Sequence, residues 1–274
     1  MDLLGLRQSK AFRCAVFPAM NFIRYGRKTL YRFTGEAEKI RRLRNSHPGE
    51  RCFIIGNGPS LAAADLDRLR GEFCFAANGI YRIFPQTGWR PQVYLCVDGF
   101  MLRDIRDTVA ALDLPLLLLL WEGRRYGLER KNGHIVYINN YCPFLIDRNR
   151  RRNGIRVSED VSIYFAAGGT VTFTSIQLAL YMGFAEIYLL GVDHRYSRVC
   201  SETGELIEHP EIVDYFDHAP AAPYSIQNVA TTTAAYRAAE EYARSHRSVI
   251  KNLTRGGALE VFERASFDEI VPPQ

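Results

Sequence analysis

The chain has 274 residues, of which 47% are apolar and 24% charged, and its formal net charge is +5. These values are ordinary for a globular protein, so the chain can bury a full core, and its length suits one α/β domain with an appendage. No apolar run approaches the ~18 residues that span a bilayer. The longest run, 114–121, is interrupted by Pro115, and we expect it to be a buried strand.

The cysteines are scattered, with no Cys-x-x-Cys pair and no histidine spacing typical of zinc. They are Cys14, Cys52, Cys74, Cys96, Cys142 and Cys200. Three of them, Cys52, Cys74 and Cys96, fall in expected core strands, where a free thiol behaves as a small apolar side chain. Scattered cysteines of this kind predict that the protein works in a reducing compartment.

The N-terminal 44 residues hold eleven Lys and Arg against three acidic residues, a net charge of +8, which leaves the rest of the chain near −3. Aromatic residues are interleaved with these charges, at Phe12, Phe17, Phe22, Tyr25, Tyr31 and Phe33. Such a pattern favours a peripheral helix on an anionic membrane surface. We therefore expect residues 1–48 to form a basic amphipathic arm, with residues 1–44 as the membrane contact, and residues 49–274 to form the nucleotide-binding domain.

Two alternatives stay open for this arm: a helical extension packed on the domain, and a contact within a homo-oligomer. A secretory signal is not expected, because no apolar segment leads to a small-residue cleavage site. Nucleic acid is not an expected partner, because no helix-turn-helix, zinc-finger or RNP pattern accompanies the charge. The expected location is cytoplasmic, peripheral to the inner membrane.

The most informative stretch is a glycine turn between an apolar strand and a helical pattern. It reads Gly56, Asn57, Gly58, Pro59 and Ser60. The glycines let a ligand approach the main chain, Pro59 suits the first turn of a helix, and Ser60 lies near the positive end of the helix dipole. The pattern predicts an anion site, where the Asn57 amide can donate to a phosphate or sugar and accept from one.

This turn is not a dinucleotide fingerprint, because Leu61 replaces the third glycine of G-x-G-x-x-G. It is not a Walker loop either, because no Gly-Lys-Ser/Thr follows. The alternative is an ordinary tight turn between a strand and a helix.

The rest of the chain alternates strand and helix patterns, which predicts a doubly wound, mostly parallel, Rossmann-like α/β sheet. Expected strands are 52–56, 73–77, 92–97, 114–120, 134–138, 186–192 and 248–252, and expected helices are 60–70, 99–111, 170–183 and 228–246. Ligands of such sheets bind outside the carboxyl ends of the strands. Polar residues follow most of these strands, namely Asn57, Ser60, Asn78, Asp98, Asp193, His194, Asn252 and Thr254. Each alone is explained as a cap or turn residue, but together they predict a binding constellation.

Two further segments fit the same site. The glycines and hydroxyls of 166–172 precede a strongly helical run and predict a second anion-receptive helix start, although the threonines also suit simple caps. Its candidate residues are Gly168, Gly169, Thr170 and Thr172. Residues 194–227 break the pattern, and a loop of that length in a compact domain is typical of an active-site lid. The lid carries His209, Tyr215, Phe216, His218 and Tyr224.

The order of these motifs resembles a known family. Ile-Gly-Asn-Gly-Pro-Ser-Leu at 55–61, Asn78 after the second strand, and a Gly-Thr helix start leading to Ala-Leu-Tyr-Met-Gly-Phe-Ala-Glu-Ile-Tyr-Leu-Leu-Gly-Val-Asp at 179–193 resemble the bacterial CMP-sialic acid sialyltransferases that decorate lipooligosaccharide. They also resemble the wider superfamily of archaeal 6-hydroxymethylpterin diphosphokinase-like proteins. The resemblance covers roughly residues 50–100 and 165–195.

The resemblance implies a GT-A-like nucleotide-binding domain with a lid and no metal. It implies that Asn57 and Ser60 hold the donor phosphate and ribose and that Asn78 holds the nucleotide. The turn at Gly169 and Thr170 would then hold the donor's other phosphate oxygens or its sugar carboxylate.

The chain also departs from this pattern. Asp98 stands where the sialyltransferases have an asparagine, and Gly168 stands in place of their arginine. Their paired tyrosines have only approximate counterparts in Tyr196 and either Tyr215 or Tyr224.

Their catalytic histidine aligns near Gln227, so the base must come from elsewhere. The candidates are His194, His209 and His218, of which His194 is best placed because it follows a strand end, beside Asp193 and Tyr196. An imidazole with a pKa near 6.5 accepts a hydroxyl proton at neutral pH.

The leading interpretation is a metal-independent glycosyltransferase that moves a sialic acid-like sugar from a CMP-activated donor onto a surface-glycan acceptor. Neutral amides, hydroxyls and a helix dipole can stabilise the leaving phosphate without a metal. The alternative is a diphosphokinase-like nucleotide phosphotransferase in which Asp98 and Asp193, at neighbouring strand ends, hold Mg²⁺. A third interpretation is a non-catalytic nucleotide-binding protein.

Overall fold

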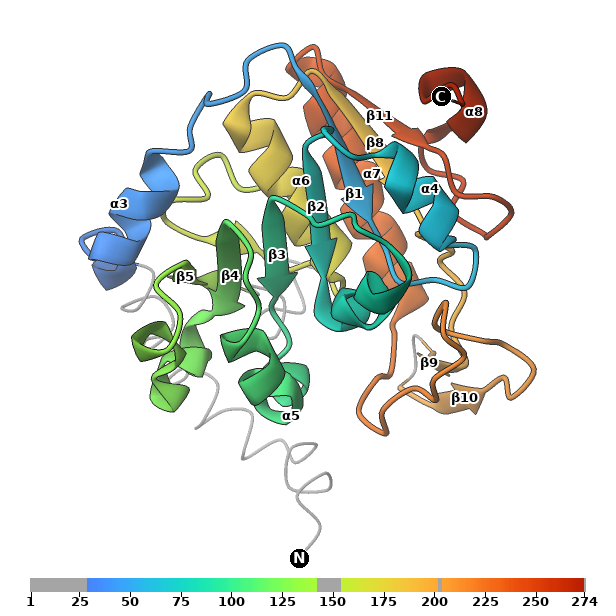
Figure 1. Ribbon diagram of the computed structural model, residues 1–274, viewed down its shortest axis with the longest axis horizontal. Coiled ribbons are helices and arrows are strands. Elements are labelled where there is room, and N and C mark those ends of the chain that lie inside the picture. Colours follow the sequence, from blue (N-terminus) through green and yellow to red (C-terminus); the bar gives the residue numbers. More distant parts are fainter. Residues whose placement is uncertain (1–28, 142–153, 202–203, 274) are drawn as a thin grey trace, which may run out of the picture.

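A parallel eight-stranded sheet forms the centre of the protein (Figure 1). The computed structural model describes residues 29–141, 154–201 and 204–273. The sheet strands are β1 (Arg51–Ile55), β2 (Cys74–Ala77), β3 (Val93–Cys96), β4 (Leu116–Leu120), β5 (Ile135–Ile138), β8 (Glu186–Leu190), β11 (Val249–Asn252) and β12 (Glu263–Arg264). Their order is β12-β11-β8-β1-β2-β3-β4-β5, and every neighbouring pair is parallel. The predicted doubly wound sheet is confirmed, and β12 was not predicted.

Helices cover both faces of this sheet. The helices are α3 (Gly35–Arg41), α4 (Ala63–Arg68), α5 (Gly99–Ala110), α6 (Val171–Met182), α7 (Val229–Ser245) and α8 (Phe267–Ile270), and the 3-10 helices are η1 (Asn78–Gln86), η2 (Trp121–Tyr126) and η3 (Leu128–Arg130). One core layer lies under α6 and α7, and the other lies under α4, η1 and α5. The strands β2, β3 and β5 are apolar and buried along their whole length, because both of their faces are covered.

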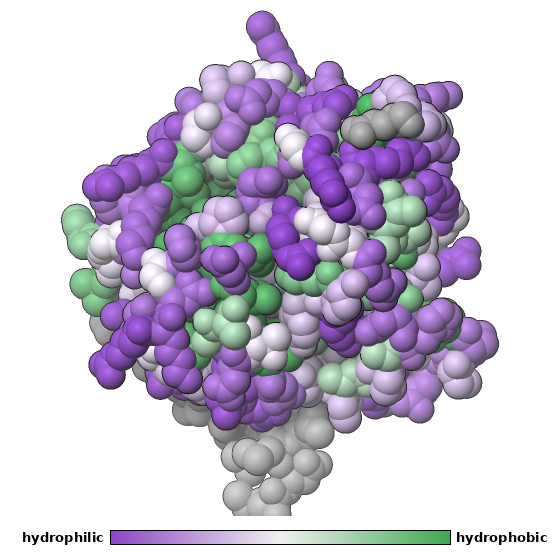
Figure 2. All heavy atoms as spheres, viewed as in Figure 1, coloured by the Kyte–Doolittle hydropathy of each residue, from purple (hydrophilic) through white to green (hydrophobic). Residues whose placement is uncertain are grey.

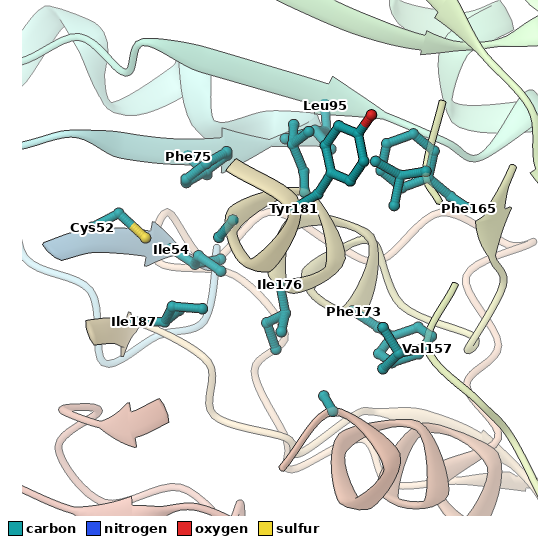
Figure 3. Close-up of a cluster of buried hydrophobic side chains, with 14 of the residues drawn as sticks. Cys52, Ile54, Phe75, Leu95, Val157, Phe165, Phe173, Ile176, Tyr181 and Ile187 are labelled. Atoms are coloured by element: carbon teal, nitrogen blue, oxygen red, sulfur yellow. The ribbon is translucent and has the colours of Figure 1, made fainter. Parts of the chain in front are cut away.

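The alternation of side chains along β1 builds both layers at once. Cys52 and Ile54 belong to the α6 layer, while Phe53 and Ile55 point to the opposite layer, as the two-residue period of a strand requires. Figure 3 shows the strand side chains on the first side gathered around α6. Because α6 is buried on nearly all sides, its N-terminus is held rigidly at the carboxyl edge of the sheet.

Strands β2 to β5 follow one another on one side of β1 in the sheet. The later strands β8, β11 and β12 lie on the other side of β1. The strand order therefore reverses between β1 and β8. A crevice forms at such a switch point outside the carboxyl ends of the strands, where ligands of these folds bind.

The described part of the N-terminal arm packs on this domain. Tyr31 is 1% exposed, and its hydroxyl donates to the Tyr137 carbonyl at 2.9 Å. The Tyr137 amide in turn donates to Glu36 Oε2 at 3.0 Å. These bonds cover the outer edge of β5, which would otherwise expose unpaired backbone groups. Residues 29–48 thus form a helical extension packed on the domain, and residues 1–28 lie outside the described residues.

Two predicted boundaries were wrong. The helix expected over 60–70 begins only at Ala63 and leaves Pro59 and Ser60 in a turn, because the groups of Ser60 bond elsewhere, as described below. The lid expected as a loop over 194–227 contains a hairpin of β9 (Arg198–Cys200) and β10 (Leu206–Glu208).

The face seen in Figure 2 is mostly hydrophilic with smaller hydrophobic patches. Among the described residues, no helix has the length and apolar character to cross a membrane.

The short strands β6 (Asn140–Tyr141) and β7 (Phe165–Ala166) pair in parallel beside the main sheet. They lead the chain from β5 toward the start of α6. Neither strand was predicted, because two residues are too few to show a period.

Candidate functional site

A cavity of about 460 Å³ opens at the carboxyl ends of β1, β2, β3 and β8, between the start of α6 and the lid. Most of the predicted site residues line it, namely Gly56, Asn57, Gly58, Asn78, Asp98, Gly168, Gly169, Thr170, Thr172, Asp193, His194 and Tyr196. The others do not line it, namely Ser60, His209, His218, Asn252 and Thr254. The strand-end rule therefore located the cavity but included several residues with other roles.

The glycine turn at 56–60 surrounds the carboxylate of Asp193, a side chain of the same protein. Ser60 Oγ donates to Asp193 Oδ2 at 2.7 Å, and the Ser60 amide donates to the same carboxylate. A Cβ on Gly58 would overlap the Asp193 carboxylate, so only glycine fits there. The amides of Gly56 and Gly58 bond the carbonyls of Leu190 and Gly191. The turn predicted to bind the anion of a ligand instead holds Asp193 through Ser60, and Ser60 does not line the cavity.

Burial raises the pKa of Asp193, and the bonds from Ser60 oppose this shift. The carboxylate is thus desolvated but partnered, and its position joins the end of β8 to the turn after β1. Hydrogen bonds to a charged group contribute about 1.5–3 kcal/mol each. This contact was not visible in the sequence, because the two residues are 133 positions apart.

Two asparagines present buried acceptor atoms with no partner in the described structure. Asn57 donates through Nδ2 to the Ala77 carbonyl at 3.0 Å, which leaves Oδ1 buried and unpartnered. Asn78, held at a φ of 53°, also has a buried, unpartnered Oδ1. A buried acceptor without a donor costs about 1–3 kcal/mol. Both amides therefore favour a ligand that carries hydroxyl or amino donors.

A third such acceptor was missed. Asn140 Oδ1 is buried and unpartnered, and Asn140 lines the same cavity. It follows the predicted strand 134–138 after one intervening residue, so the strand-end rule applied to that strand would have found it.

The start of α6 presents donors to the cavity. Thr170 caps the helix by accepting from the Thr172 amide at 3.3 Å, and Gly169 adopts a φ of +78° that suits glycine. Gly168 has no room for a side chain, because a Cβ there would lie 2.5 Å from Ala235 and Phe173. The helix dipole makes this end favourable for a phosphate or carboxylate.

His194 stands at the end of β8, held at a φ of 54°. Its Nε2 lies 2.9 Å from Thr233 Oγ1, and its Nδ1 lies 3.4 Å from the Tyr196 hydroxyl. Burial lowers the pKa of His194 and raises that of Tyr196. The tautomer that donates from Nε2 to Thr233 leaves the lone pair on Nδ1, so a neutral His194 can act as a base. The sequence does not predict the contact of Thr233 with His194, because Thr233 lies inside the helical pattern of 228–246, far from His194 along the chain.

The other two candidate histidines lie outside this cavity. His209 pairs with Glu211 at 3.5 Å, and His218 is an exposed residue of the lid. Asn252 and Thr254 are buried, where the Asn252 side chain donates to the Leu259 carbonyl and Thr254 Oγ1 accepts from the Val192 amide. Their hydrogen bonds hold the backbone after β11 and β8.

The lid is tied to the domain at three places. The Phe216 amide donates to the Asn57 carbonyl at 3.0 Å. Arg82 pairs with Asp217 at 2.9 Å, and the Tyr224 hydroxyl donates to Asp104 at 2.7 Å. The cavity is therefore covered by a segment that contacts the glycine turn directly.

The predicted pairing of Asp98 and Asp193 was wrong. They do not follow neighbouring strands, because β1 and β2 lie between β8 and β3. Three strand spacings place their backbones about 14 Å apart, too far for a shared Mg²⁺ with ligand distances of about 2 Å. Asp98 instead caps α5 by accepting from the amides of Phe100 and Met101, each at 2.8 Å. Within the described part of the chain, no group of three His, Cys, Asp or Glu could hold a metal ion.

Comparison with known proteins places the chain in a family. Residues 28–199 match the family described as 6-hydroxymethylpterin diphosphokinase MptE-like. No curated protein matches. The MAf glycosyltransferase from Magnetospirillum magneticum AMB-1 has a similar solved structure, with a TM-score of 0.51 and 17% identity over 85% of this chain and 38% of that one. The chain thus spans less than half of that protein, and the likeness bears on the fold alone.

The sialyltransferase CstII from Campylobacter jejuni, solved with cytidine-5'-monophosphate, has a TM-score of 0.44 and 16% identity over 80% of this chain and 86% of that one. A second CstII structure, with CMP-3FNeuAc, has the same score and identity.

The burial of His194 predicts how stability depends on pH. Its pKa is lowered from 6.5, so the unfolded chain takes up this proton first as the pH falls. The contribution of neutral His194 is complete above about pH 6.5 and is lost as the pH falls from there through the lowered pKa. Urea titrations at about pH 7.5 and about pH 5.5 should show a larger loss of unfolding free energy in the wild type than in His194→Gln. An equal loss in both proteins would assign the effect to other groups.

Proposed function

The chain belongs to the 6-hydroxymethylpterin diphosphokinase MptE-like family, and on that premise we propose that it is a nucleotide-dependent transferase that moves a sugar from a nucleotide-sugar donor onto a glycan hydroxyl. The observation that carries the proposal is the pair of buried, unpartnered oxygens of Asn57 and Asn78 in the cavity. A ribose or a base amino group supplies the donors that they lack. The sequence resemblance favours a CMP-linked, sialic acid-like donor.

The chemistry needs two further groups. The leaving phosphate gains negative charge, which the start of α6 stabilises through its amides and dipole. The acceptor hydroxyl loses a proton, which the neutral His194 accepts at Nδ1. Both groups line the same cavity as the two asparagines. In this proposal the residues of the chain suffice for these steps, and no metal takes part.

A second candidate is a phosphotransferase that transfers diphosphate from a nucleotide. The name of the family favours it, as does the presence of Asp98, Asp193 and Asp214 in the cavity lining. The proposed use of Asp98 and Asp193 as ligands of one Mg²⁺ does not fit their separation, so we assign no step to such an ion. A third candidate is a non-catalytic protein that binds a nucleotide.

Nucleotide binding should depend on Asn57. The change Asn57→Ala removes an acceptor that a ligand donor would use and should weaken binding by about 1–3 kcal/mol, or roughly 5- to 150-fold in Kd. Isothermal titration with CMP, UDP, GDP and ADP, each with and without Mg²⁺, measures this. Asn132→Ala is the matched control, because Asn132 donates to the Leu112 carbonyl at 2.7 Å away from the cavity. Equal affinities in all three proteins would remove Asn57 from the site.

Turnover should depend on His194. The change His194→Ala should lower kcat by ~10²–10⁴, because general-base catalysis contributes about that factor. The affinity for the donor should change little. Release of CMP from a CMP-linked donor in the presence of acceptor glycan is the readout.

Full activity in His194→Ala, with loss in His209→Ala or His218→Ala, would contradict this assignment and move the base to the lid. Activity that EDTA abolishes and Mg²⁺ restores would contradict the metal-independent mechanism and favour the second candidate.

We also propose that the N-terminal region binds an anionic membrane surface. Leu30 and Phe33 are 69% and 77% exposed, and the Arg32 guanidinium lies over the Phe33 ring at 5.2 Å. This tip continues into the basic residues 1–28, so apolar and cationic groups meet on one segment.

Phosphatidylglycerol liposomes should float the full chain at low salt and lose it above ~0.5 M salt, where charges are screened within a few Å. The test variant lacks residues 1–28 only, because a longer deletion would remove Tyr31 and Glu36 from β5. If the variant without residues 1–28 and the double variant Leu30→Ser/Phe33→Ser both float as well as the full chain, the membrane contact is refuted.

A further inference from the structure

We propose that Arg195 binds the phosphate of the nucleotide and supplies the positive charge of the site. This inference rests on the proposed function and adds to it the residue that recognises the anionic part of the donor. Arg195 lines the cavity and follows His194 directly at the end of β8. No motif in the sequence assigns Arg195 a role.

The charges of the lining make a cation necessary. Three carboxylates line the cavity, those of Asp98, Asp193 and Asp214, and among the described lining residues Arg195 is the one Lys or Arg. A phosphate that enters this cavity meets a net negative wall unless a cation offsets it. No side chain at position 168 can supply one, because a Cβ there has no room.

The guanidinium of Arg195 is available for a ligand. Each lining carboxylate is engaged by other groups: Asp98 by the first amides of α5, Asp193 by Ser60, and Asp214 by the amide and hydroxyl of Ser197. Within the described structure no carboxylate forms an ion pair with Arg195, whose charge acts on Asp193 only at a distance. Arginine binds phosphate through a planar fork of donors, which neither Lys nor an amide reproduces.

The backbone of Arg195 is held in place although its side chain is exposed. The Asp193 carbonyl accepts from the Ala258 amide at 2.7 Å, and the His194 ring is fixed by Thr233. A Cβ on Gly257 would lie 2.8 Å from the same carbonyl, so the chain after β11 packs closely on this point. Arg195 therefore stands after the end of β8, on a backbone segment that these contacts hold beside His194, and its exposed side chain retains the freedom to meet a ligand.

The test compares nucleotides with their nucleosides, which differ only in the phosphate. Isothermal titration of the full chain with CMP, UMP, AMP and GMP, each beside its nucleoside, identifies the base that binds best. For that pair, Arg195→Ala should weaken nucleotide binding by about 10- to 100-fold and leave nucleoside binding within about twofold. Arg195→Lys should recover part of the loss. The matched control is Arg237→Ala, an exposed arginine of α7 that does not line the cavity and carries the same charge.

The outcomes separate this inference from the proposed function. Equal nucleotide affinity in Arg195→Ala and the wild type would overturn the role of Arg195 and leave the nucleotide site standing. Equal losses for nucleotide and nucleoside, or the same loss in Arg237→Ala, would also overturn it, because the effect would not follow the phosphate. A wild-type chain that binds none of the nucleotides would overturn both proposals.

Discussion

The contact between the Asp193 carboxylate and the turn at 56–60 organises the rest of the site. It joins the ends of β1 and β8 at the point where the strand order reverses. The close approach requires glycine at position 58 and directs the hydroxyl and amide of Ser60 inward. A desolvated carboxylate is costly unless it is partnered, so this arrangement fixes the backbone on both sides of it.

The internal anion determines which groups remain for a ligand. Because Asp193 occupies the turn, the side of the cavity near β1 and β2 offers acceptors, the oxygens of Asn57 and Asn78. The opposite side offers the donor end of α6, and the end of β8 offers a neutral imidazole. The groups proposed as acceptors for a nucleoside, as donors for a phosphate and as a base for a hydroxyl therefore stand on separate elements. This separation suits a transfer reaction, in which a leaving group and an incoming nucleophile must be treated differently.

Much of the fold followed from local pattern. Each predicted sheet strand and each longer predicted helix appears, because continuous apolar runs and helical periods are local signals. The cavity was also predictable, since polar residues after parallel strands meet at one edge. Pairings between distant parts of the chain were not, as Ser60 with Asp193 and Arg82 with Asp217 show. The strand order was equally hidden, and it separates Asp98 from Asp193.

The turn at 56–60 holds the chain's own carboxylate, so the proposed site for a nucleotide phosphate lies elsewhere, at the start of α6. A crystal structure of the full chain with bound CMP distinguishes these two positions. We expect phosphate oxygens within hydrogen-bond distance of the amides that follow Thr170, with Ser60 still bonded to Asp193. Phosphate density inside the turn at 56–60, with Ser60 released from Asp193, would overturn the proposed phosphate site at α6.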